Sequence, residues 1–232
     1  MLLSQKKTLL QKIKQSMLEL LLTTRALRFK GESGVWEEVE LGEIGKFVRG
    51  SGLTKADLYP DNQGGKLVGA IHYGEIHTYY KNHTDKVISF VSPLLAQKLK
   101  KVDEGDIIIA VTSEDIAGVC CAVAWLGDAQ IVTGGHTAIF KHSQISKFIA
   151  YWLQSEYFSG QKRNIAHGIK VIEVSPKNLG KILIPLPPLP TQQKIAHLLS
   201  TLDRLIELTH QEQQLLARIT RALRDQLICK EN

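Results

Sequence analysis

The chain has 232 residues, of which 44% are hydrophobic, and a formal net charge of +6. This size allows one large domain or one domain with appendages, and the apolar stretches are well short of the roughly 20 residues that a membrane-spanning helix needs. A lysine-rich start without a cleavable apolar segment is not typical of a signal peptide, so we expect a cytoplasmic protein without a membrane partner. The three cysteines fit neither a disulfide framework nor a metal-binding Cys-x-x-Cys pair, and we expect them to be buried thiols.

The positive charge is concentrated near the amino terminus. Residues 1–30 contain seven basic residues against Glu19 alone, whereas residues 31–190 contain 16 basic and 17 acidic residues. The net charge therefore says little about the central region. Seven basic residues between Lys141 and Lys181 do indicate a local basic face.

Apolar residues in the first segment recur every three or four positions, and the segment from residue 2 to residue 22 contains neither glycine nor proline. This pattern predicts a helix of about 25 residues that ends before Gly31.

Residues 35–140 contain short apolar runs separated by glycine and aspartate, which is typical of strands. We expect strands within residues 36–41, 66–71, 86–91, 106–111, 119–126 and 137–140, and a short helix within 92–99. Residues 145–158 carry Phe148, Trp152 and Leu153 on one side and predict one longer helix. A strand is expected over 179–184, before four prolines between residues 185 and 190 make the chain extended and stiff.

A second long helix is predicted from Thr191, acting as its N-cap, to about Ile228. At 1.5 Å per residue it would be on the order of 55 Å long, so we expect it to pack on another long helix. Its distal part matches the first helix at a constant offset, with Leu215 corresponding to Leu9 and Ile228 to Leu22. Two unrelated amphipathic helices also align in this way, so the match indicates either coincidence or a repeated unit.

These elements predict an α+β protein with three parts: a spacer helix at residues 1–30, a mixed, β-rich domain at residues 31–190, and a helix at residues 191–232. The two helices are expected to form an antiparallel, coiled-coil-like bundle. The positions expected at a dimer or partner interface are Leu9, Ile13, Met17, Leu20, Leu199, Leu202, Ile206, Leu216, Ile219 and Leu223.

Motifs of enzymes that act on DNA are absent from the sequence. Gly64-Gly65-Lys66 lacks the spacing and the hydroxyl of a nucleotide-binding loop, and no Asn/Asp-Pro-Pro-Tyr/Phe motif of an amino-methyltransferase occurs. The histidines at 72, 77 and 83 lack the helical spacing of zinc ligands. We therefore expect no catalytic residues, no metal site and no cofactor.

The loops of the central region instead carry groups that suit nucleic-acid binding. Basic side chains suit phosphate contacts, while aromatic rings and short polar groups suit base edges. A solvated surface position is the ordinary alternative for each residue, and it is their grouping that favours binding. The residues predicted to contact double-stranded DNA are Arg49, Lys55, Lys66, His72, Tyr73, His77, Thr112, Ser113, Glu114, His136, Arg163, His167 and Lys170.

Two blocks of sequence resemble a known family. Residues 35–44 (VWEEVELGEI) resemble the opening strand of a target-recognition domain, and residues 182–189 (ILIPLPPL) with Gln192–Ala196 and Leu199–Asp203 resemble a closing strand, a proline hinge and a conserved helix. The family is that of specificity subunits of type I DNA restriction and methylation systems, and the resemblance covers nearly the whole chain. It implies a non-catalytic subunit that joins two methyltransferase subunits and on which restriction and translocase subunits dock.

The sequence departs from this family in one respect. A usual member has two recognition domains and two conserved helices, whereas this sequence has one recognition domain. We therefore expect a homodimer that recognises a bipartite, inverted-repeat target. Two alternatives are a truncated or silent fragment that only binds the methyltransferase, and an independent enzyme such as a nuclease.

Overall fold

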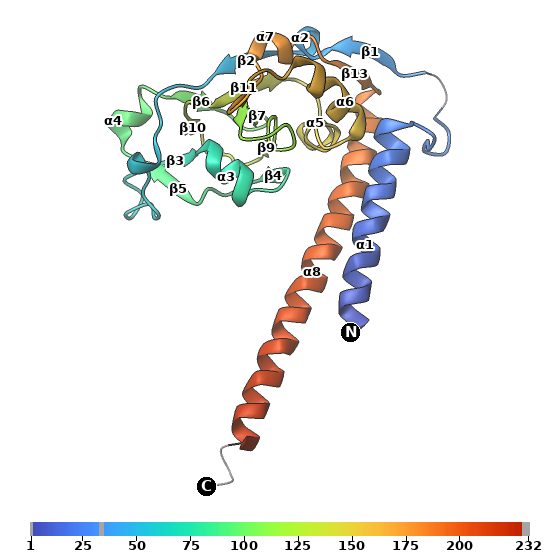
Figure 1. Cartoon of the computed structure of the whole chain (residues 1–232), viewed down its shortest axis with the longest axis vertical. Helices are drawn as coiled ribbons and strands as arrows, with labels where there is room; N and C mark the ends of the chain where they lie inside the picture. Colours follow the sequence, from blue (N-terminus) through green and yellow to red (C-terminus); the bar gives the residue numbers. More distant parts are fainter. Residues whose placement is uncertain (1, 33–34, 229–232) are drawn as a thin grey trace.

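Two long helices project from one side of a β-rich domain (Figure 1). The computed structural model describes residues 2–32 and 35–228. Helix α1 (Leu2–Leu18) and helix α8 (Leu189–Ile228) run antiparallel and contact each other, and α8 continues well beyond the amino-terminal end of α1. The α+β class and the antiparallel pair of long helices are thereby confirmed.

Polar contacts fix the register of the two helices. The Lys14 Nζ atom donates to Asp203 Oδ1 at 2.7 Å, and Lys7 Nζ lies 3.2 Å from His210 Nδ1. Asp203 also accepts a hydrogen bond of 2.7 Å from the Tyr151 hydroxyl, which ties the helix pair to the domain.

Both helices differ from the prediction at the end nearest the domain. Helix α1 ends at Leu18 and a π-helical turn (Glu19–Thr23) follows it, in which Leu21 and Leu22 are buried in the main core. Helix α8 begins at Leu189, so the prediction that Thr191 is the N-cap was wrong. The amide of Thr191 already donates to Pro188 O at 2.9 Å, so Thr191 is inside the helix. The helix can begin before it because a proline fits the first turn of a helix, and Pro190 occupies that turn here.

The strands form two larger sheets and two short pairs. The five-stranded sheet has the order β2-β11-β7-β9-β4, and the four-stranded sheet has the order β5-β3-β10-β6. The strands of the first are β2 (Gly45–Arg49), β11 (Thr137–His142), β7 (Ile107–Ala110), β9 (Ala122–Trp125) and β4 (His83–Thr84). Those of the second are β5 (Ser89–Val91), β3 (Val68–Ile71), β10 (Ile131–Thr133) and β6 (Lys100–Val102). The pairs are β1 (Glu37–Glu40) with β13 (Leu183–Leu186), and β8 (Thr112–Ser113) with β12 (Ile172–Glu173).

The core lies on both faces of the five-stranded sheet. Ile107 and Ile109 of β7 belong to the cluster that also contains side chains of α5, α6 and α8, whereas Ile108 and Ala110 belong to a second cluster with β3, β6 and β10. Because both faces are covered, β7 is a continuous apolar run rather than an alternating one. The six strands predicted between residues 36 and 140 are confirmed, and they correspond to β1, β3, β5, β7, β9 and β11.

Several predicted boundaries were wrong. Residues 145–158 form two helices, α5 (Ser146–Trp152) and α6 (Glu156–Ile165), because the Ser155 hydroxyl accepts from Phe158 N at 3.2 Å and starts a new helix. Residues 176–179 form a short helix, α7 (Pro176–Leu179), so the last strand begins only at Leu183. The remaining short helices are α2 (Leu41–Ile44), α3 (Tyr73–Thr78), α4 (Pro93–Ala96) and a 3-10 turn, η2 (Lys55–Asp57).

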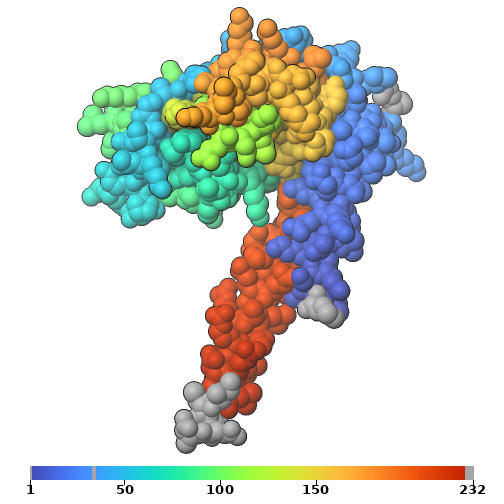
Figure 2. All heavy atoms as spheres, in the orientation of Figure 1, coloured from blue at the N-terminus to red at the C-terminus, as the bar shows by residue number. Residues whose placement is uncertain are grey.

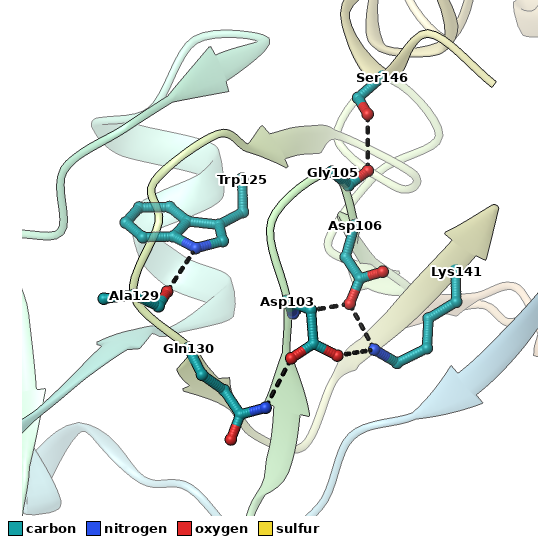
Figure 3. Close-up of polar contacts among 8 residues, drawn as sticks. All are labelled: Asp103, Gly105, Asp106, Trp125, Ala129, Gln130, Lys141 and Ser146. Carbon is teal, nitrogen blue, oxygen red and sulfur yellow. Dashed lines mark hydrogen bonds and ion pairs between the residues drawn. The ribbon is translucent and has the colours of Figure 1, made fainter. Parts of the chain in front are cut away.

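An ion-pair network at the turn between β6 and β7 joins the two larger sheets (Figure 3). Lys141 Nζ of β11 contacts Asp103 Oδ2 at 2.8 Å and Asp106 Oδ2 at 2.6 Å, and Gln130 donates to Asp103 Oδ1 at 2.6 Å. These bonds lower the pKa of Asp103, chiefly through Lys141. Nearby, Ser146 of α5 donates to Gly105 O at 2.7 Å, so the turn also anchors a helix.

The expectations about membrane-spanning helices and cysteines can be compared with the structure. Across residues 2–32 and 35–228, no helix is long and apolar enough to cross a membrane. Cys120 is buried and Cys121 half-buried, both as free thiols, while Cys229 is outside the described residues.

Candidate nucleic-acid interface

A cleft of about 630 Å³ opens where α3, the turn between β10 and β11, and the segment from β8 to residue 118 meet. Six residues predicted from the sequence line this cleft: Tyr73, His77, Thr112, Ser113, Glu114 and His136. The remaining lining residues were not predicted, and they are Gly74, Thr78, Asp115, Ala117, Gly118 and Val171. The prediction therefore selected residues that are distant in sequence but share one site.

His72 positions the first wall of the cleft. Its Nδ1 atom accepts from Gly74 N at 3.2 Å, and its own amide donates to the Glu75 carboxylate at 2.9 Å, so the residue caps α3. Burial lowers the pKa of His72, and the nearby charges of His136 and Lys55 lower it further. The neutral ring of His72 is 9% exposed, and its Nδ1 atom is used in capping α3. A direct contact between His72 and DNA stays a prediction.

Aromatic rings cluster at this wall. The Tyr73 ring lies 4.6 Å from the ring of His72 and 4.9 Å from that of His136, both measured between centroids, and 6.2 Å from that of His77. His136 comes from the turn between β10 and β11, where it has a positive φ of 66° and its carbonyl accepts from Val111 N at 2.9 Å. The cluster thus presents planar surfaces from two separate elements.

Short polar residues form the second wall. Strand β8 holds Thr112 and Ser113 beside β12, with Ser113 opposite Ile172. After β8 the chain turns tightly, because Asp115 Oδ1 accepts from Gly118 N at 2.6 Å. We call residues 114–121 the recognition loop.

The buried ammonium group of Lys162 anchors the recognition loop from α6. It donates to Ala117 O at 3.2 Å and to Val119 O at 2.9 Å, and the residue is only 7% exposed. Sequence inspection missed this role, since a lysine on an amphipathic helix is ordinarily solvated.

The predicted phosphate contacts are spread around the cleft. Arg49 forms an ion pair of 2.5 Å with Glu173 of β12, the strand that pairs with β8. Lys170 is exposed in the segment that precedes β12, next to Val171, which lines the cleft. His167, which was predicted to lie nearer the bases, is exposed in the same segment. Lys55 is exposed on η2 and close enough to lower the pKa of His72.

Seven of the thirteen predicted residues are outside the cleft lining, and Lys66 and Arg163 are two of them. Lys66 precedes β3, whereas Tyr73 follows the other end of that strand. Arg163 lies 3.8 Å from Glu156 on its own helix. Their contacts with DNA stay predictions.

The predicted helix positions differ in exposure, and five of them, one exposed and four half-buried, are Leu9 and then Ile13, Met17, Leu20 and Ile206. Leu199 is fully buried in the domain core and Leu202 is 9% exposed, so both belong to contacts within the chain. Leu216, Ile219 and Leu223 are about half exposed on the distal part of α8, which stands clear of the domain (Figure 2).

Within residues 2–32 and 35–228, no cluster of three or more His, Cys, Asp or Glu side chains could hold a metal ion.

Comparison with known proteins identifies the family. Residues 34–218 match the model of the type I restriction modification DNA specificity domain. This chain belongs to that family. A specificity domain is the non-catalytic, targeting part of a type I restriction–modification system.

Individual relatives agree with the family match. The chain is 26% identical over 189 residues to the putative type I restriction enzyme MjaX specificity subunit of Methanocaldococcus jannaschii, covering 77% of the chain and 39% of that protein. The crystal structure of the HsdS subunit from Thermoanaerobacter tengcongensis is similar, with a TM-score of 0.62 and 18% identity, over 97% of this chain and 52% of that one. A chain from a structure on complex assembly and conformational transition of the type I system has a TM-score of 0.58 and 18% identity, over 95% and 53%. The chain thus spans about half the length of the solved chains that it matches, and these two likenesses show the fold.

Proposed function

We propose that this chain is a half-length specificity subunit that binds double-stranded DNA and directs methyltransferase and restriction subunits to a bipartite target. The observation that carries the proposal is the cleft, in which six residues chosen for DNA-contact chemistry meet in a domain of the DNA specificity family. Aromatic rings, hydroxyls and two carboxylates line the cleft, and Lys170 and Arg49 lie near it. Groups suited to base edges therefore lie in the cleft, and basic groups suited to phosphates lie beside it, which is the division of contacts used in DNA recognition.

Selection of duplexes from a random pool by the full chain tests DNA recognition. We expect enrichment of one defined sequence. A pool that stays random after repeated rounds would overturn the proposal and favour a fragment that only binds methyltransferase.

We further propose that two copies form the functional unit. Outside the contact with α1, helix α8 carries an exposed apolar stripe made of Leu205, Leu208, Leu215, Leu216, Ile219, Leu223 and Leu227, each between 43% and 74% exposed. The stripe lies on a different side of α8 from Leu199 and Ile206, since the helical period separates the two sets. The stripe is about 33 Å long at 1.5 Å per residue. It is therefore a continuous apolar surface and not a set of isolated exposed leucines.

A second copy of the chain is the partner that fits this stripe. The chain covers 52% of the solved subunit from Thermoanaerobacter tengcongensis, so a second copy would supply the other half of its length. Antiparallel pairing of two α8 helices brings equal stripes together around a two-fold axis and leaves one domain at each end. Two identical domains related in this way would contact inverted half-sites at a separation set by the helices.

Sedimentation equilibrium at micromolar concentration tests the dimer. We expect a mass of two chains. A single-chain mass across that range would overturn the dimer while leaving recognition of one half-site open to the selection experiment.

A further inference from the structure

The lining of the cleft is acidic, although the proposed ligand is a polyanion. Glu114 and Asp115 line it, and no lysine or arginine is among its lining residues within the described chain. Carboxylates repel phosphate oxygens, so the DNA backbone is a poor occupant of this cleft. Given the proposed function, on which this inference rests, a base edge is the part of DNA that these carboxylates can meet.

Of the two carboxylates, Asp115 is committed to the fold of the recognition loop. Its Oδ1 atom accepts from Gly118 N at 2.6 Å, and its amide lies 3.5 Å from Ser113 Oγ. Glu114 is exposed, and within residues 2–32 and 35–228 its side chain forms no hydrogen bond beside those of Ser113 and Asp115 and no ion pair. Its carboxylate is therefore the acceptor in the cleft that is available to a ligand.

The chemistry of a carboxylate limits which base it can recognise. An ionised carboxylate only accepts hydrogen bonds, and the amino donors in the major groove are N4 of cytosine and N6 of adenine. On adenine the acceptor N7 lies beside N6 and faces the second carboxylate oxygen, which is repulsive. On cytosine the neighbouring group is a C–H, which carries no lone pair. We propose that Glu114 specifies cytosine at one position of each half-site by accepting a hydrogen bond from its N4 amino group.

Parallel selections with three proteins test this assignment: the wild-type full chain, Glu114→Gln, and the control Glu43→Gln, which changes another exposed glutamate, on α2. The wild type and the control should enrich the same sequence, with cytosine at one position of each half. Glu114→Gln should change that position to adenine, because a glutamine amide can pair with N6 and N7 together, and should leave the other positions unchanged. In direct binding, replacing that cytosine with adenine should weaken the wild type about tenfold and strengthen the variant by a similar factor.

The outcomes distinguish the two proposals. A wild-type pool that stays random contradicts the proposed function and removes the basis for this inference. A wild-type sequence that Glu114→Gln enriches unchanged, or one without cytosine, overturns the Glu114 assignment alone. Equal weakening at all positions by Glu114→Gln also overturns it, because that result indicates a structural role.

Discussion

The ammonium group of Lys162 on α6 lies 2.9 Å from the carbonyl oxygen of Val119, which belongs to the recognition loop. A second bond, to Ala117 O, makes this buried group the anchor of the loop. Lys162→Met keeps the length of the side chain but leaves both carbonyls without this donor, and we expect a loss of about 1–3 kcal/mol in the free energy of unfolding. Urea unfolding measures it.

The adjacent Arg163 provides the control. Its side chain is exposed, and Arg163→Met should change the free energy of unfolding by less than about 0.5 kcal/mol. Equal destabilisation by both variants would contradict the anchoring role of Lys162.

Tyr73 contributes a ring to the cleft, and we expect the ring rather than the hydroxyl to matter for DNA. Tyr73→Ala should weaken binding of the selected duplex by roughly 1–3 kcal/mol, whereas Tyr73→Phe should bind nearly as the wild type does. Fluorescence anisotropy measures both, with Tyr79→Ala as control, since Tyr79 is 61% exposed and outside the cleft lining. Unchanged affinity in Tyr73→Ala would remove Tyr73 from the interface.

Lys170 is exposed beside the cleft, and we expect it to contact a phosphate. Lys170→Ala should weaken binding of selected and unrelated duplexes alike and reduce the slope of log affinity against log salt by about 1. Lys12→Ala, on the exposed face of α1, should leave the slope unchanged. A change of preference at one base position would instead make Lys170 a base contact.

His142 makes the stability of the fold sensitive to acid. Burial lowers its pKa to about 4, its Nε2 atom is buried without a hydrogen-bond partner among the described residues, and its Nδ1 accepts from Gln144 N at 3.1 Å. The unfolded chain binds a proton on this residue near pH 6.5, so between pH 6.5 and 4 the unfolded state holds more protons than the folded state. The free energy of unfolding therefore decreases as the pH is lowered through this range.

His142→Asn removes this titration while its Oδ1 atom keeps an acceptor near Gln144 N. Between pH 7 and pH 5 the wild type should lose about 2 kcal/mol more of its free energy of unfolding than the variant does. Urea unfolding at the two pH values gives the difference. Parallel losses in the two proteins would show that His142 takes up its proton in the folded state.

Ile219 lies within the exposed stripe of α8. Ile219→Asp should convert the dimer to a monomer without lowering the helix content, because a charge placed within an apolar two-fold interface is desolvated. Gln214→Asp places the same charge on another side of the helix and should leave the dimer intact. Sedimentation equilibrium with circular dichroism checks both, and a dimeric Ile219→Asp would exclude the stripe as the interface.

Local patterns predicted the elements whose signals are local. The long helices follow from uninterrupted three-and-four spacing, and β7 follows from its unbroken apolar run. Ser155 was missed as a helix start because the apolar spacing of residues 145–158 continues through it. Strands β2, β6 and β10 were missed because only their neighbours in the sheet define them.

The candidate site was predicted as a set of residue types and not as a place. Thr112 and Tyr73 lie near each other only because β8 and β3 belong to sheets whose strand order the sequence does not encode locally. His72 as a helix cap and Lys162 as a buried anchor depend on contacts with residues remote in the chain or on local backbone geometry, and composition carries no signal for either.

Native mass spectrometry of the full chain bound to its selected duplex tests most directly whether two copies recognise one inverted repeat. We predict a complex of two chains on one duplex whose enriched sequence is an interrupted inverted repeat. A complex of one chain on one duplex with a single uninterrupted site would contradict it.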